Sequence, residues 1–105
     1  MVSTDTHSFS FEELQKYNGE EGRPVYVSVQ RTVYDMSSGA TFYGPGGPYH
    51  IFAGHECSRA LAKMKIDESE LNDNIEDCSE KERQTLQDWV RKFVSKYPIV
   101  GVLRD

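Results

Sequence analysis

Two tyrosines flank a short segment of glycine and proline, and their phenols are the side chains best suited to chemistry. Between Tyr43 and Tyr49 the chain reads Gly-Pro-Gly-Gly-Pro, a composition that neither a helix nor a central strand tolerates. We therefore expect a stiff loop over Ser38 to Pro48 whose backbone can approach a ligand closely. A phenol has a pKa near ~10 in water, so it binds a metal only where a hard cation such as ferric iron displaces its proton. The loop thus predicts a site that offers phenol oxygens.

Two capping boxes mark the starts of helices that must position this loop. Ser10 with Glu13, and Ser79 with Glu82, each pair an N-cap hydroxyl with an acidic side chain three residues later. The first helix should end near residue 17, and Pro98 should stop the second. We also expect a helix over residues 55–64 and a short one around residue 71. The apolar stripes are Leu86, Trp89, Val90, Phe93, Val94 and Tyr97 in the long helix, and Cys57, Ala60, Leu61 and Met64 in the helix over residues 55–64.

Three short segments have the pattern of β-strands. Pro24 to Gln30 alternates strictly, with its valines on the side expected to be buried. Thr32 to Met36 is close enough to pair with it as a hairpin, although the turn lacks the usual glycine. Ile99 to Leu103 reads as a final strand. The predicted fold class is therefore α+β, with a small sheet and several short helices around one core.

Composition limits the chain to one domain and excludes several partners. We expect a single domain over residues 8–103 and a disordered tail over residues 1–7 of the 105. The net charge of −5, without any run of Lys and Arg, argues against binding to nucleic acid. The apolar stretches are far shorter than the ~20 residues of a membrane helix, so no membrane span is expected. The N-terminus lacks the pattern of a secretory signal, which predicts a cytoplasmic protein.

The loop and its surroundings resemble the membrane-associated progesterone receptor family, a branch of the cytochrome b5-like haem/steroid-binding domains. The resemblance extends over about Phe9 to Leu103. Its most specific parts are the loop from Phe42 to Tyr49 and the later pair Asp88-Trp89. Further matching pieces are Tyr17-Asn18-Gly19, Pro24-Val25-Tyr26-Val27, Val33-Tyr34-Asp35-Met36, Phe52-Ala53-Gly54, Ser58-Arg59-Ala60-Leu61-Ala62 and Lys96-Tyr97-Pro98-Ile99-Val100-Gly101.

The resemblance implies a cytochrome b5-like fold that binds ferric haem b, with Tyr49 as the axial ligand of the iron. It also implies that Tyr43 and Lys96 lie near the haem propionates and that Tyr97 donates a hydrogen bond to the ligating phenol. A phenolate ligand favours ferric over ferrous iron, which argues against electron transfer of the cytochrome b5 kind. Implied partners are haem, steroids and haem-thiolate mono-oxygenases of sterol metabolism. The resemblance further implies a haem-dependent homodimer and a peripheral position on endomembranes such as the endoplasmic reticulum.

Two histidines beside the loop offer alternative ligands. His50 and His55 are only five residues apart, so they cannot grip a porphyrin from opposite faces. His50 alone remains a competitor of Tyr49 for the iron. A metal cluster of His50, His55 and Cys57 has no familiar zinc spacing. These histidines and Cys57 are also where the chain departs from the pattern of the family.

Three classes of function are compatible with a small pocket protein, and the sequence ranks them. No nucleophile–base pair, carboxylate dyad or phosphate-binding motif is present, so we expect a non-enzymatic protein. The main hypothesis is a haem-binding protein, and the alternative is a steroid-, lipid- or protein-binding module without haem. Tyr49 discriminates between them, because haem binding requires its oxygen whereas a lipid pocket would tolerate phenylalanine there.

Overall fold

A four-stranded mixed sheet is the framework of the domain, in the computed structural model that describes residues 7–104. Its strands are β1 (His7–Phe9), β2 (Tyr26–Val29), β3 (Thr32–Asp35) and β4 (Ile99–Leu103). They lie in the order β1-β4-β3-β2, with β1 parallel to β4 and the other pairs antiparallel. The α+β fold class and the hairpin of β2 and β3 are therefore confirmed.

The prediction of a disordered tail over residues 1–7 is wrong at His7, which is the first residue of β1. His7 pairs with Gly101 of β4, and Phe9 pairs with Leu103. A Cβ atom at position 101 would lie 2.2 Å from the His7 carbonyl oxygen, so only glycine lets the two strands approach. A strand of three residues carries too little alternation to be recognised in the sequence. Residues 1–6 lie outside the described residues.

The hairpin turn is built without glycine. Gln30 and Arg31 both have left-handed backbones, with φ of 50° and 67°, which is the geometry of a type I′ turn. A buried carboxylate, that of Glu56, accepts hydrogen bonds from the Arg31 N–H at 2.9 Å and from the Ser28 hydroxyl at 2.8 Å. It also accepts one from the Ser58 N–H at 3.0 Å. Glu56 thus ties the hairpin to the start of α3 (Ser58–Lys63) and offsets the strain of the turn.

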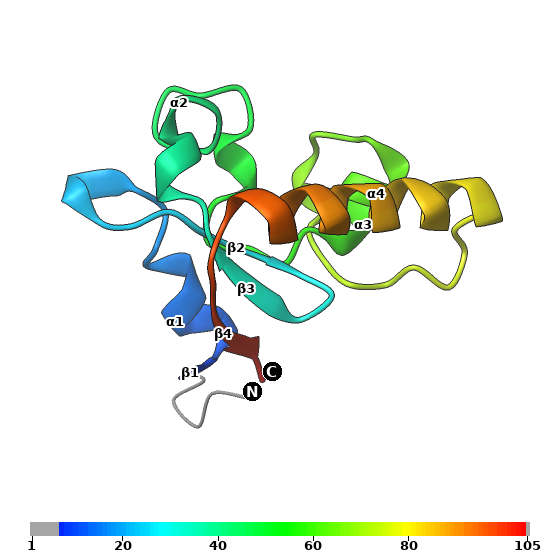
Figure 1. Cartoon of the computed structure of the whole chain (residues 1–105), viewed down its shortest axis with the longest axis horizontal. Coiled ribbons are helices and arrows are strands. Elements are labelled where there is room, and N and C mark those ends of the chain that lie inside the picture. The colour runs from blue at the N-terminus through cyan, green and yellow to red at the C-terminus, as the bar shows by residue number, and fades with distance from the viewer. Residues whose placement is uncertain (1–6, 105) are drawn as a thin grey trace.

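The helices surround the sheet unevenly (Figure 1). Both capping boxes are present, at Ser10 before α1 (Phe11–Gln15) and at Ser79 before α4 (Glu80–Lys96). The helix α4 runs beside α3 (Ser58–Lys63), whereas α2 (Ala40–Tyr43) lies near the C-terminal end of α4, where Tyr43 packs against Phe93 (Figure 1). The helices are α1 (Phe11–Gln15), α2 (Ala40–Tyr43), α3 (Ser58–Lys63) and α4 (Glu80–Lys96), with short 3-10 turns at η1 (Glu20–Gly22), η2 (Ser37–Gly39), η3 (His50–Phe52) and η4 (Glu68–Glu70).

Several predicted boundaries are wrong. The expected loop over Ser38 to Pro48 is helical as far as Tyr43, because the continuous run of glycine and proline begins only at Gly44. The helix α1 ends at Gln15, two residues earlier than predicted. The short helix predicted around residue 71 is the 3-10 turn η4, which ends at Glu70. Met64 was expected in the core, yet it lies beyond the end of α3 and is 71% exposed.

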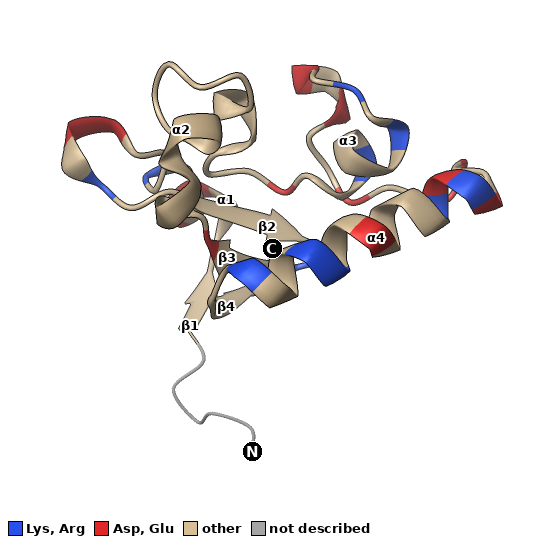
Figure 2. Cartoon of the chain, turned by 45° about the horizontal axis from the view of Figure 1, so that its top comes forward, with Lys and Arg blue, Asp and Glu red and all other residues tan. Residues whose placement is uncertain are grey.

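The core divides into two clusters. The larger one lies between the sheet, α3 and α4 and includes Phe93 and Leu86, whereas Val94 of the predicted stripe is exposed. The smaller one packs Leu14 of α1 against Phe9. Figure 2 shows basic residues on the C-terminal part of α4 and acidic residues on the loop that contains η1. Among residues 7–104, no helix has the length and apolarity that crossing a membrane demands.

Candidate ligand-binding site

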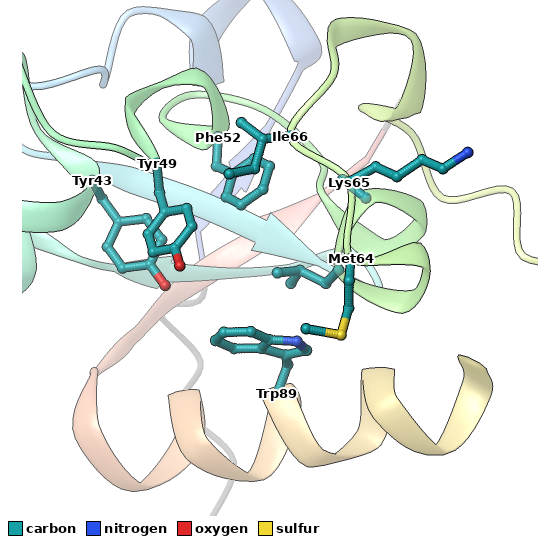
Figure 3. A pocket seen from close by; sticks show the side chains of 9 residues that line it. Tyr43, Tyr49, Phe52, Met64, Lys65, Ile66 and Trp89 are labelled. Atoms are coloured by element: carbon teal, nitrogen blue, oxygen red, sulfur yellow. The ribbon is translucent and has the colours of Figure 1, made fainter. Parts of the chain in front are cut away.

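A cavity of about 110 Å³ lies between the loop that follows α2, the end of α3 and one face of α4 (Figure 3). Its lining is mostly aromatic and aliphatic. Lys65 is the only charged side chain among the described residues that line it. The lining residues are Tyr43, Tyr49, Phe52, Ala60, Leu61, Met64, Lys65, Ile66 and Trp89.

Tyr49 is held at this cavity by its backbone and by a ring stack. Its N–H donates to the Phe42 carbonyl oxygen at 2.8 Å, which closes the loop. A Cβ atom at Gly47 would lie 2.5 Å from the same oxygen, so the closure depends on glycine. The Tyr49 ring lies parallel to that of Phe52, with centroids 5.9 Å apart and planes inclined by 3°. The phenol of half-buried Tyr49 therefore faces the cavity in a fixed direction (Figure 3).

Tyr43 lies beside Tyr49 but is much more deeply buried. It is the last residue of α2, is 5% exposed and packs edge-on against Phe93. Burial, with smaller contributions from the neighbouring phenols of Tyr97 and Tyr49, raises the pKa of Tyr43 far above its ordinary value. Tyr43 therefore keeps its proton and can serve as a hydrogen-bond donor at the cavity.

Tyr97 and Lys96 lie behind the tyrosine pair and do not line the cavity. The Tyr97 ring is buried and packs edge-on to Tyr43, with centroids 6.5 Å apart. Its hydroxyl lies against Gly39, where an added Cβ atom would come within 2.7 Å of it. Lys96 ends α4 and is exposed, with its ammonium 6.0 Å from the centroid of the Tyr97 ring. The structure thus brings Tyr43, Tyr49 and Tyr97 into one cluster and leaves Lys96 at its edge.

Seven of the nine lining residues were not predicted as site residues, and Trp89, Met64, Lys65 and Ile66 are among them. Trp89 was assigned to the core stripe of α4, but it is half-buried and faces the cavity (Figure 3). Met64, Lys65 and Ile66 follow α3, and they reach the cavity because Met64 turns the chain with a left-handed φ of 54°. The pair Asp88-Trp89 was already a specific motif, so Trp89 could have been proposed. No sequence signal marked the other three.

The two histidines and Cys57 do not form a metal site. His50 places its Nε2 atom 2.9 Å from the Asn18 carbonyl oxygen, and it does not line the cavity. His55 is half-buried, and burial lowers its pKa, although Glu68 opposes this. Burial raises the pKa of Cys57 well above its usual range, so its thiol stays protonated. Within residues 7–104, no group of three or more His, Cys, Asp or Glu side chains is placed to hold a metal ion.

Comparison with known proteins agrees with this architecture. The model of the cytochrome b5-like haem/steroid-binding domain matches residues 10–104. A solved protein of Arabidopsis thaliana, described as having a cytochrome b5 like fold, superposes with a TM-score of 0.87 at 42% identity, covering 99% of this chain and 96% of that one. The chain therefore belongs to the cytochrome b5-like haem/steroid-binding domain family, and its fold is confirmed.

Individual relatives show to which branch of this domain family the chain belongs. Probable steroid-binding protein 3 of Arabidopsis thaliana is 47% identical over 94 residues, which are 89% of this chain and 94% of the relative. Cytochrome P450 regulator dap1 of Schizosaccharomyces pombe is 44% identical over 87% of this chain and 59% of its own length. Human membrane-associated progesterone receptor component 2 is 38% identical over 90% of this chain and 44% of its own length. Within the domain family, the chain is a member of the membrane-associated progesterone receptor family. It spans only about half the length of the last two relatives.

Proposed function

We propose that this protein binds ferric haem b through the phenolate of Tyr49 and that it is not an enzyme. The observation that carries the proposal is the fixed position of the Tyr49 phenol at an apolar cavity, beside the protonated phenol of Tyr43. An anionic oxygen with a neutral donor next to it is a suitable ligand set for ferric iron.

The lining of the cavity fits a flat, apolar cofactor. Phe52 and Trp89 supply aromatic surface on the two sides of the site, and the aliphatic residues supply the remainder (Figure 3). At about 110 Å³ the cavity is smaller than the roughly 300–1,000 Å³ of pockets that enclose drug-sized ligands. A ligand as large as haem would therefore remain partly exposed beside Met64 and Ile66, which are 71% and 55% exposed.

The other residues of the cluster have supporting roles in this proposal. Tyr43 and Tyr97 act as hydrogen-bond donors, to a propionate and to the ligating phenol respectively, and Lys96 pairs with a propionate. Bound haem would supply a ferric centre that the anionic ligand protects from reduction. Two relatives are named as a steroid-binding protein and a P450 regulator, which favours a role in haem supply or in assisting haem-thiolate mono-oxygenases, peripheral to endomembranes.

A hemin titration of the purified protein tests the proposal. We expect the wild type to take up one hemin with a ferric high-spin spectrum that mild reductants do not change. The substitution Tyr49→Phe should weaken binding by about 100-fold, because it removes the ligand atom itself. Tyr17→Phe is a matched control, since Tyr17 stacks on Tyr26 in the smaller core cluster, with centroids 4.5 Å apart. Unchanged affinity and spectrum in the Tyr49 variant would refute the assignment.

The same protein could instead bind a steroid in this cavity, and the names of the relatives favour that second candidate. A steroid offers no metal, so it has no need of the Tyr49 oxygen. Steroid binding that survives Tyr49→Phe, together with absence of hemin uptake by the wild type, would establish this alternative.

A haem that remains exposed on one face also favours a haem-dependent homodimer. Sedimentation of the ligand-free and hemin-loaded protein measures this directly. We expect a monomer without hemin and a dimer with it, whereas a monomer in both states excludes the dimer.

A further inference from the structure

His50 joins the turn that presents Tyr49 to a distant segment, residues 18–25. Its Nε2 atom lies 2.9 Å from the carbonyl oxygen of Asn18, in a partly buried contact. A carbonyl oxygen can only accept, so the His50 ring must donate and must carry a proton on Nε2. The neutral Nε2 tautomer and the imidazolium both satisfy this requirement.

A second contact joins the same two segments. A Cβ atom at Gly19 would lie 2.9 Å from Pro45 Cδ and 3.7 Å from Gly44 Cα, so the turn after Asn18 packs directly on the glycine–proline loop. Gly19 also has a φ of 83°, which favours glycine there. The loop is therefore supported at its start, where Gly44 and Pro45 pack on Gly19, and just after its end, where His50 forms its hydrogen bond.

Residues 18–25 are themselves fixed to the sheet. Asn18 forms an antiparallel bridge with Val25, and the Gly19 N–H donates to the Pro24 carbonyl oxygen at 3.1 Å. The carbonyl oxygen of buried Val25 accepts from the Met36 N–H, directly after β3, at 2.6 Å. Asn18 thus offers His50 a partner whose position is set by the sheet.

We propose that His50 is a positioning residue for the Tyr49 phenol, acting through Asn18. This inference rests on the proposed binding of haem by Tyr49. Tyr49 is half-buried, and the carbonyl groups of Tyr49 and His50 start the short turn η3 by accepting from the N–H groups of Phe52 and Ala53, both at 3.0 Å. Fixing His50 restrains the backbone of its neighbour, and a ligand atom that is already in place loses less conformational entropy on binding.

Two substitutions separate the hydrogen bond from the bulk of the ring. In His50→Ala we expect the rate of hemin loss to rise and the affinity to fall by about threefold to tenfold, the effect of one hydrogen bond. His50→Gln keeps an N–H donor and should remain within about twofold of the wild type. His7→Ala on β1 is the control, because His7 lies in the opposite part of the molecule and contacts Glu13.

Amide hydrogen exchange of the ligand-free protein provides a readout that does not depend on haem. The Tyr49 N–H, bonded to Phe42, should exchange faster in His50→Ala, while exchange at Val27 in β2 stays unchanged. Equal hemin loss in His50→Ala and the wild type would overturn the positioning role and leave the Tyr49 assignment intact, as would equal weakening in His50→Ala and His50→Gln. A spectrum lost in both His50 variants but kept in Tyr49→Phe would make His50 the iron ligand and overturn both proposals.

Discussion

The rings of Tyr43 and Tyr49 lie side by side at the cavity, with centroids 5.6 Å apart and planes inclined by 33°. The two phenols come from different structural settings, since Tyr43 ends a helix inside the core and Tyr49 ends a loop near the surface. In the proposed haem site, their different environments suit them to different roles. The buried phenol of Tyr43 resists ionisation, whereas the phenol of Tyr49 is half-buried and lines the cavity.

Replacement of Tyr43 by phenylalanine tests this division of roles. We expect Tyr43→Phe to lower hemin affinity by about twofold to tenfold, because it removes one hydrogen-bond donor and leaves the ligand atom in place. The charge-transfer bands of the tyrosinate-bound iron should persist in this variant and disappear in Tyr49→Phe. A reversed pattern of spectra would show that Tyr43 is the ligand.

Two matched substitutions test the proposed pairing of Lys96 with a haem propionate. Lys96→Gln should weaken hemin binding about threefold to tenfold through the loss of a charge-assisted contact, and it should not affect binding of hemin dimethyl ester, which has no carboxylate. Lys65→Gln removes the same charge from a residue that lines the cavity, whose Nζ atom lies 4.0 Å from Glu70 Oε1. If only Lys65→Gln weakened the binding of hemin, and did not weaken the binding of the dimethyl ester, the propionate would pair with Lys65 and not with Lys96.

The end of α3 is expected to be a place where stability can be gained. Met64 adopts the left-handed conformation in a Schellman motif, in which the Lys65 N–H donates to the Ala60 carbonyl oxygen at 2.9 Å. Because this conformation is costly for residues with a Cβ atom, Met64→Gly should raise the free energy of unfolding in urea by about 0.5–1 kcal/mol. Met64→Ala keeps the backbone cost and should show no such gain. Both variants should bind hemin more weakly if the Met64 side chain contacts the ligand.

The acid sensitivity of the fold should depend on the ion pair of Asp77 with Arg59. The Arg59 guanidinium, which donates to Asp77 Oδ2 at 3.0 Å, lowers the pKa of Asp77 to about 2. A pKa below the unfolded value of about 3.9 means that the pair stabilises the protein above that pH. This stabilisation is lost as the pH falls towards 2. Thermal unfolding of Asp77→Asn should therefore occur at a lower temperature than that of the wild type at pH 6, and the difference should disappear as the pH falls through 2. A difference that is independent of pH would exclude this ion pair as its source.

The starts of α1 and α4, and the end of α4, could be predicted from residues that are close together in the sequence. The capping boxes at Ser10 and Ser79 depend on residues three apart, so the sequence displays them directly. Pro98 ends α4 for an equally local reason, the absence of an N–H and the fixed φ of its ring. By contrast, β1 exists because Gly101, more than ninety residues away, leaves room for its backbone, and no local pattern announces such a pairing.

The candidate site likewise has features that follow from local sequence and features that depend on tertiary contacts. The sequence by itself determined that Tyr43 and Tyr49 flank a stiff loop, since glycine and proline restrict the backbone wherever they occur. Only the tertiary structure decided that Trp89 faces that loop, because one face of α4 serves both the core and the cavity. It also decided that His50 bonds to Asn18, a contact across 32 positions that depends on how two segments fold onto the same end of the sheet.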